Sequence, residues 1–117
     1  MHFNLEYFLY LLPVLAVIWM LLKRRGDISS AEARRMVKTA GARLVDVRTP
    51  GEFASRHLEG AVNIPVGDLD QSLKKLGPKD RPVVLYCASG ARSALAARVL
   101  KQNGFKTVRN LGAMSRW

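Results

Sequence analysis

The feature that most constrains this chain is a run of apolar residues near its N-terminus. Residues 7–22 are 16 consecutive residues without a charged side chain, and Pro13 interrupts their helical character. About twenty helical residues span ~30 Å, which is the thickness of the hydrocarbon core of a bilayer. We therefore expect residues 3–22 to cross a membrane as one helix, with Pro13 tolerated inside it.

A buried core helix and a cleaved signal peptide are the two alternatives for this run. A core helix is disfavoured because so long an apolar run is unusual in a small domain. A signal peptide needs positive charge before the run and a small-residue cleavage site after it. Here no Lys or Arg precedes the run, Lys23-Arg24-Arg25 follows it, and no Ala-x-Ala-like site lies between Ala16 and Gly26. The sequence thus predicts an uncleaved anchor.

The distribution of charge orients the predicted anchor. All 19 Lys and Arg residues lie at position 23 or later, and the net charge is +10. Positively charged flanks stay in the cytoplasm, and they are attracted to anionic headgroups. We expect a single-pass protein of the inner (cytoplasmic) membrane, with residues 1–25 as anchor and basic flank and residues 26–117 as a cytoplasmic domain. A lone cysteine fits that reducing compartment.

Composition argues against two other classes of function. The basic residues of the domain are scattered over several predicted helices, without aromatic platforms or a recognisable nucleic-acid-binding module. They include Arg34, Arg35, Lys38, Lys74, Lys75, Lys101 and Lys106. One cysteine and two histidines make a metal site within one chain improbable. We expect no nucleic acid, no metal and no other cofactor.

Residues 26–117 alternate between strand and helix patterns. Runs rich in β-branched and apolar residues predict four strands, at residues 44–47, 61–65, 82–86 and 107–111. Apolar periodicity and helix-start signals predict helices at residues 29–40, 49–56, 68–76 and 93–102. Ser29 and Glu32 have the spacing of a capping box. The alternation predicts one α/β domain with a mainly parallel central sheet flanked by helices.

Cys87 follows the most apolar predicted strand and precedes a helix. Ligands of open α/β sheets bind at the carboxyl ends of the strands. There the backbone N–H groups of residues 88–92 and the positive end of the next helix favour a thiolate, which is the nucleophilic form. Gly90 supplies the permissive backbone that such a loop needs, and Arg92 adds a grip for an oxyanion. The alternative is a buried, inert cysteine.

Three linked motifs resemble those of the rhodanese homology domain. They are residues 44–53 (LVDVRTPGEF), 57–65 (HLEGAVNIP) and 84–93 (VLYCASGARS), and Asn110-Leu111-Gly112 with Trp117 resembles the closing segment. The resemblance covers roughly residues 27–117. It implies a rhodanese-like three-layer fold and sulfur transfer. In domains of this family, a cysteine takes a sulfane sulfur from a donor such as thiosulfate, becomes a persulfide, and passes the sulfur to cyanide, a thiol or a protein.

The resemblance also implies roles for individual residues. Cys87 is the catalytic nucleophile, and the substrate-binding loop consists of Ala88, Ser89, Gly90, Ala91 and Arg92. The loop from Cys87 to Arg92 has six residues, the length associated with sulfurtransferases, whereas related phosphatases have one more. Ala88 stands where many active sulfurtransferases carry a positive or polar residue. Because of that departure, the sequence leaves open whether the loop binds thiosulfate strongly.

Four functions therefore compete for the chain. The leading one is a membrane-anchored sulfurtransferase, and the second is a persulfide carrier or binding module that serves one partner protein. A phosphatase or oxyanion reductase is disfavoured by the loop length. A non-catalytic scaffold is disfavoured because Cys87 and Arg92 are both present.

Four further polar residues lie within the motifs. We expect Arg48 and Glu52 to form an ion pair with each other, and Asp46 is a candidate for the wall of the pocket. The resemblance implies that His57 helps to hold a turn, although a Cys–His pair with Cys87 is the chemical alternative. Arg56 departs from the glycine usual in the family, which leaves the geometry of that turn open.

Overall fold

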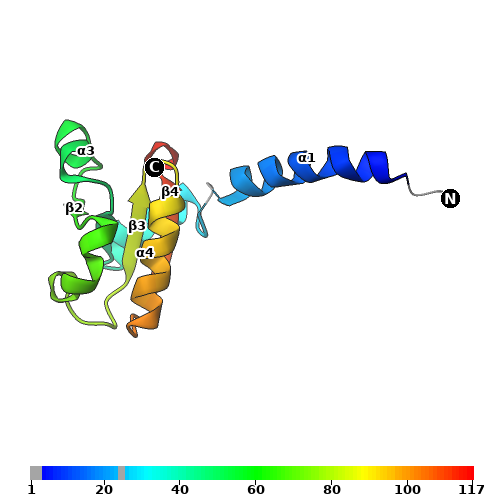
Figure 1. The fold of residues 1–117 in the computed structure, drawn as a ribbon. Coiled ribbons are helices and arrows are strands. Elements are labelled where there is room, and N and C mark those ends of the chain that lie inside the picture. The colour runs from blue at the N-terminus through cyan, green and yellow to red at the C-terminus, as the bar shows by residue number, and fades with distance from the viewer. Residues whose placement is uncertain (1–3, 24–25) are drawn as a thin grey trace.

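A computed structural model describes residues 4–23 and 26–117 of the chain (Figure 1). Helix α1 (Leu5–Lys23) extends away from the domain, and residues 4–22 are exposed. Within the described residues, one helix is long and apolar enough to cross a membrane, judged by length and composition: the window Leu5–Leu22 has a mean hydropathy of 2.1. Residues 1–3 and the basic residues 24 and 25 of the predicted anchor segment 1–25 lie outside the described residues.

The domain is built on one sheet of four parallel strands in the order β2-β1-β3-β4. The strands are β1 (Arg43–Asp46), β2 (Val62–Asn63), β3 (Val83–Cys87) and β4 (Val108–Ala113). The predicted parallel sheet is confirmed. The strand predicted at residues 61–65 is reduced to two residues and ends before Pro65, which has no N–H to donate to a ladder.

The central strand β3 has all five residues buried, and its side chains alternate between two cores. Leu85 and Cys87 pack on one face beneath α4 (Ala91–Gln102) and the 3-10 helices η1 (Val66–Gln71) and η2 (Leu73–Leu76). Val84 and Tyr86 pack on the other face against α2 (Ser30–Thr39). Helices thus cover both faces of the sheet, as the three-layer prediction requires (Figure 1).

Two predicted helices differ from the structure. The single helix expected at residues 68–76 is wrong, because η1 and η2 replace it. Ser72 separates them with φ −120° and ψ 15°, and its N–H bonds to the carbonyl oxygen of Leu69. Such 3-10 segments are short because their hydrogen-bond geometry is poor. Helix α4 begins at Ala91 rather than at Ser93, so its first turn reaches closer to Cys87 than predicted.

The parallel strands bring their carboxyl ends to one edge of the sheet, and the segments that leave this edge define the candidate site. Strand β1 leads into α3 (Pro50–Ser55), and β3 leads through a short loop into α4. Because β1 and β3 are neighbours, α3 and that loop meet at the same edge. The side-chain amide of Asn63, on β2, donates to the carbonyl oxygens of Asp46 and Arg48 at 3.0 and 2.9 Å and fixes the exit of β1.

Candidate active site

The sulfur of Cys87 lies in a nest of backbone and hydroxyl groups. Cys87 is the last residue of β3 and is fully buried. Its Sγ accepts hydrogen bonds from the backbone N–H groups of Gly90, at 2.9 Å, and Ser93, at 3.4 Å. The Ser93 hydroxyl lies 3.4 Å from Sγ and donates to the carbonyl oxygen of Gly90 at 3.1 Å. Donors therefore converge on the atom at which a negative charge would form.

The backbone of Gly90 explains how this nest closes. Gly90 is the N-cap of α4 and has φ 98°, in the left-handed region that glycine adopts without the steric cost of a Cβ. The turn returns the Gly90 N–H to the sulfur three residues earlier and starts α4 beside it. The positive end of the helix dipole then adds to the two N–H groups. Ala88 and Ser89 are exposed at the rim.

Within the described residues, the side-chain hydrogen bonds of Arg92 go to Glu52 of α3 rather than to the sulfur, and the two side chains form an ion pair. The two side chains meet through Nη1–Oε1 at 2.6 Å and Nη2–Oε2 at 3.1 Å, and each is 35% exposed. This contact with Arg92, aided by the N–H of Thr49, lowers the pKa of Glu52 to about 2. The same contact with Glu52 raises the pKa of Arg92.

Helix α3 holds Glu52 at this position through a capping box. The Thr49 hydroxyl accepts the N–H of Glu52 at 3.2 Å, and the Glu52 carboxylate accepts the N–H of Thr49 at 3.2 Å. Pro50 at the start of the helix presets its backbone. The predicted ion pair between Arg48 and Glu52 is therefore wrong: Glu52 points across to Arg92.

Arg48 pairs instead with Asp46 in the interior. Its Nη2 lies 2.8 Å from Oδ2 of Asp46, its Nε lies 3.1 Å from both carboxylate oxygens, and its backbone N–H donates to Oδ1 at 2.8 Å. This contact raises the pKa of Arg48. Asp46 is fully buried and its carboxylate is bound by Arg48, and its place in the wall of the pocket stays a prediction. The guanidinium also donates to the carbonyl oxygen of Arg56 and so fastens the segment after α3.

His57 has its contacts in α3. Its Nδ1 lies 2.7 Å from the carbonyl oxygen of Phe53, and the two rings stack with centroids 3.7 Å apart. None of the hydrogen bonds that Cys87 makes within the described part of the chain involves His57. These contacts agree with a role in holding the turn.

Sequence reasoning missed the contribution of Ser93. The residue is fully buried and supplies both an N–H and a hydroxyl to the surroundings of Sγ. A helix start two residues earlier would have placed Ser93 in the first turn, where its N–H has no partner within the helix and can turn to an anion. In residues 4–23 and 26–117, no group of three or more His, Cys, Asp or Glu side chains is placed to hold a metal ion.

A buried thiol at the carboxyl end of a parallel strand, with N–H donors around it, is what the motifs predicted. A family model described as the rhodanese-like domain matches residues 29–117. The chain belongs to the rhodanese-like family. Helices on both faces of a parallel sheet are the fold that this membership implies, and the chain has that fold.

Two similar proteins carry names that describe sulfur transfer, and a third, YqhL, carries a name without a function. A sulfurtransferase of Allochromatium vinosum is 39% identical over 90 residues, which are 76% of this chain and 83% of that protein. The thiosulfate sulfurtransferase PspE of Escherichia coli is 32% identical over 92 residues, 78% of this chain and 88% of that protein. YqhL of Bacillus subtilis is 43% identical over 77 residues, 65% of this chain but only 60% of that protein.

The fold agrees with a solved rhodanese-like structure. The human single-domain sulfurtransferase TSTD1 superposes with a TM-score of 0.68 at 30% identity, covering 77% of this chain and 92% of that one. Family membership, named relatives and fold together support a rhodanese-type sulfurtransferase in general terms.

Proposed function

We propose that this protein is a membrane-anchored sulfurtransferase in which Cys87 carries the sulfur as a persulfide. The observation that carries the proposal is the nest around Sγ, with the N–H groups of Gly90 and Ser93 at 2.9 and 3.4 Å. Preorganised donors of this kind stabilise a charge where it develops during reaction. The loop residues Ala88, Ser89, Gly90, Ala91 and Arg92 surround the incoming donor.

The proposed reaction has two steps, each a substitution at sulfur. The Cys87 thiolate attacks the sulfane sulfur of thiosulfate, the S–S bond of the donor breaks, and sulfite leaves with the electron pair. The persulfide that remains keeps its negative charge on the outer sulfur, within reach of the same N–H donors. An acceptor thiolate or cyanide then attacks the outer sulfur and releases the Cys87 thiolate, so no oxidant or reductant is consumed.

A persulfide carrier is the second candidate, and the Arg92–Glu52 ion pair favours it. A donor oxyanion that used Arg92 would have to displace a carboxylate held at 2.6 Å. Ala88 adds no second cation to the loop. A persulfide donor, such as a partner protein, delivers sulfur without a sulfonate group and does not need that displacement.

The membrane placement is part of the proposal. Its support is the length and apolarity of α1 and the position of every Lys and Arg at residue 23 or later. We propose a single-pass anchor in the inner membrane, with the rhodanese-like domain in the cytoplasm. Extraction of membranes at high salt tests the anchor: the full chain should stay in the membrane fraction, and release into the aqueous phase would contradict it.

The intact mass of the full chain in a neutral detergent tests the chemistry. After incubation with thiosulfate the mass should increase by one sulfur atom, and a thiol acceptor should remove it. The Cys87→Ser variant is the matched control, since it replaces the only cysteine. A gain from a persulfide-bearing donor alone would favour the carrier. A gain in Cys87→Ser, or no gain from any donor, would contradict both functions.

A further inference from the structure

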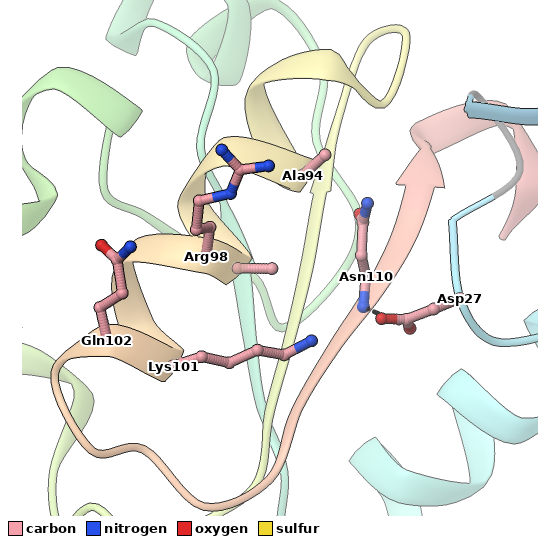
Figure 2. A pocket seen from close by; sticks show the side chains of 7 residues that line it. Asp27, Ala94, Arg98, Lys101, Gln102 and Asn110 are labelled. Atoms are coloured by element: carbon pink, nitrogen blue, oxygen red, sulfur yellow. Dashed lines mark hydrogen bonds between the residues drawn. The ribbon is translucent and has the colours of Figure 1, made fainter. Parts of the chain in front are cut away.

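A hollow lies between α4 and the edge strand β4, and Cys87 is not among the residues that line it. Its volume is about 480 Å³, and it is lined by Asp27, Ala94, Ala97, Arg98, Lys101, Gln102 and Asn110. Figure 2 shows Arg98 and Lys101 projecting from α4 on one side, with Asp27 and Asn110 on the other. None of these residues belongs to the sulfur site, so the hollow needs an explanation of its own.

The charge of the lining favours an anion. Arg98 and Lys101 are exposed and lie three residues apart, on one face of α4. Neither forms an ion pair or a side-chain hydrogen bond within the described part of the chain. Asp27 is the single carboxylate of the lining, and its Oδ1 is already engaged by the N–H of Asn110 at 2.8 Å. Two cations thus face one carboxylate.

The hollow is fixed to the point where the chain enters the domain. The N–H of Asp27 donates to the carbonyl oxygen of Asn110 at 2.7 Å, and the side chain of Asp27 accepts in return, so the two residues clamp together. Gly26 packs so tightly that an added Cβ would lie 2.2 Å from the carbonyl oxygen of Asn110, and its φ is +67°. The segment Gly26-Asp27, through which the chain enters the domain, is therefore tied to β4 at Asn110.

This clamp limits the distance between the hollow and α1. Helix α1 ends at Lys23, four residues before Asp27. Four residues of extended chain reach at most ~14 Å. A helix that spans a bilayer would therefore hold the hollow beside the headgroup layer, where phosphates are concentrated.

A neighbouring apolar side chain points to the same partner. A smaller hollow continues along α4 and is lined by Ala91, Ala94, Leu95 and Arg98. Leu95 is 53% exposed, and within the described residues it is the one strongly exposed large hydrophobic side chain outside α1. A cation pair beside an exposed leucine suits the boundary between headgroups and acyl chains better than it suits a free anion in water.

We propose that the hollow between α4 and β4 binds the phosphate of an anionic phospholipid through Arg98 and Lys101, with Leu95 in contact with the lipid boundary. The inference goes beyond sulfur transfer and rests on the proposed anchor. Bound in this way, the domain is held against the membrane with a defined face.

The test uses the full chain in nanodiscs of phosphatidylcholine mixed with phosphatidylglycerol. Native mass spectrometry of the released protein identifies the lipid that stays bound. The wild-type chain should retain phosphatidylglycerol in preference to phosphatidylcholine. The double variant Arg98→Gln, Lys101→Gln should lose this retention roughly ten- to thirtyfold, because each cation near an anionic surface contributes separately.

The matched control is Lys74→Gln with Lys75→Gln, which removes the same charge from η2, outside the hollow. It should retain the lipid like the wild type. Equal retention by the two double variants, or no preference for phosphatidylglycerol in the wild type, would overturn the proposal. So would inorganic phosphate that stabilises the detergent-solubilised chain as strongly as short-chain phosphatidylglycerol does, since the hollow would then be a free-anion site.

Sulfur loading measured in the same nanodiscs separates this inference from the proposed function. The Arg98→Gln, Lys101→Gln variant should load sulfur on Cys87 as the wild type does. Lipid retention without sulfur loading in the wild type would contradict the sulfurtransferase and leave the lipid site standing. A full chain that is washed from membranes at high salt would overturn the anchor and the lipid site together.

Discussion

Two carboxylate–guanidinium pairs lie at the carboxyl edge of the sheet, and they have the same chemistry in different surroundings. In the Asp46–Arg48 pair the side chains are 0% and 7% exposed. In the Glu52–Arg92 pair both are 35% exposed. Both are bidentate, but only the second lies beside the loop that carries Cys87.

The difference in burial separates a structural pair from one that a ligand can open. Separating a buried ion pair leaves each charge without a partner and without water to solvate it, so the two side chains stay together. A partly exposed pair exchanges its partner for water or for another anion at little cost. We infer that Asp46–Arg48 holds the edge of the sheet together and that Glu52–Arg92 governs access of anionic donors.

The largest expected effect comes from breaking the buried pair. Asp46→Ala leaves Arg48 buried without its carboxylate, which should lower the free energy of unfolding by about 3–5 kcal/mol. Urea unfolding of the full chain in a neutral detergent, followed by circular dichroism, measures the loss. The double variant Asp46→Ala, Arg48→Met removes both charges and should recover part of it. Unchanged stability of Asp46→Ala would show that the pair is dispensable.

Opening the exposed pair should change substrate capture rather than stability. Glu52→Gln removes the carboxylate that occupies Arg92, so the KM for thiosulfate should fall several-fold with little change in the unfolding midpoint. Glu59→Gln is the charge-matched control, because Glu59 is exposed and lies outside the ion pairs of the described residues. If both variants lower KM equally, the fall in KM comes from the loss of one negative charge anywhere on the domain. Glu52 would then not control the binding of thiosulfate by Arg92.

Local signals in the sequence predicted most of the fold. The apolar run of β3, the helix-start residues and the alternation of strands with helices were sufficient for the parallel sheet and its two covering layers. The helix at residues 68–76 was mispredicted because Leu69, Leu73 and Leu76 have helical spacing. That spacing of apolar residues does not distinguish one α-helix from two 3-10 helices that are separated at Ser72.

The partners of charged side chains could not be read from the sequence. Arg48 and Glu52 are four residues apart, which suits a local pair, but Arg48 turns inward to Asp46 and Glu52 turns to Arg92, forty residues away. That choice depends on β1 and β3 being neighbours, which is a property of the tertiary fold. The hollow beside Asp27 was missed for the same reason, since its lining brings Asp27 together with residues of α4 and β4.

A smaller effect is expected at Tyr86, beneath the buried pair. Its hydroxyl accepts the N–H of Leu58 at 3.1 Å, and Tyr86→Phe leaves that N–H without its partner, at a cost of about 1 kcal/mol. Burial raises the pKa of Tyr86 to about 12. The wild type should therefore lose stability as the pH rises from about 10 to 12, because the unfolded tyrosine ionises first. The Phe variant should lack that alkaline loss, and an identical loss in both would contradict the assignment.

The smallest expected effect is the acid response of the exposed pair. The pKa of Glu52 is lowered from 4.5 to about 2, so its contribution to stability is complete above about pH 4.5 and is lost as the pH falls through about 2. Urea midpoints of the wild type and of Glu52→Gln should differ slightly at neutral pH and converge towards pH 2. Asp46 and Arg48 are present in both proteins, so the buried pair cancels in the difference. A difference between the two urea midpoints that persists below pH 2 would mean that Glu52 acts through its shape and its capping contacts. The attraction between its charge and Arg92 would then contribute nothing to the stability of the folded state.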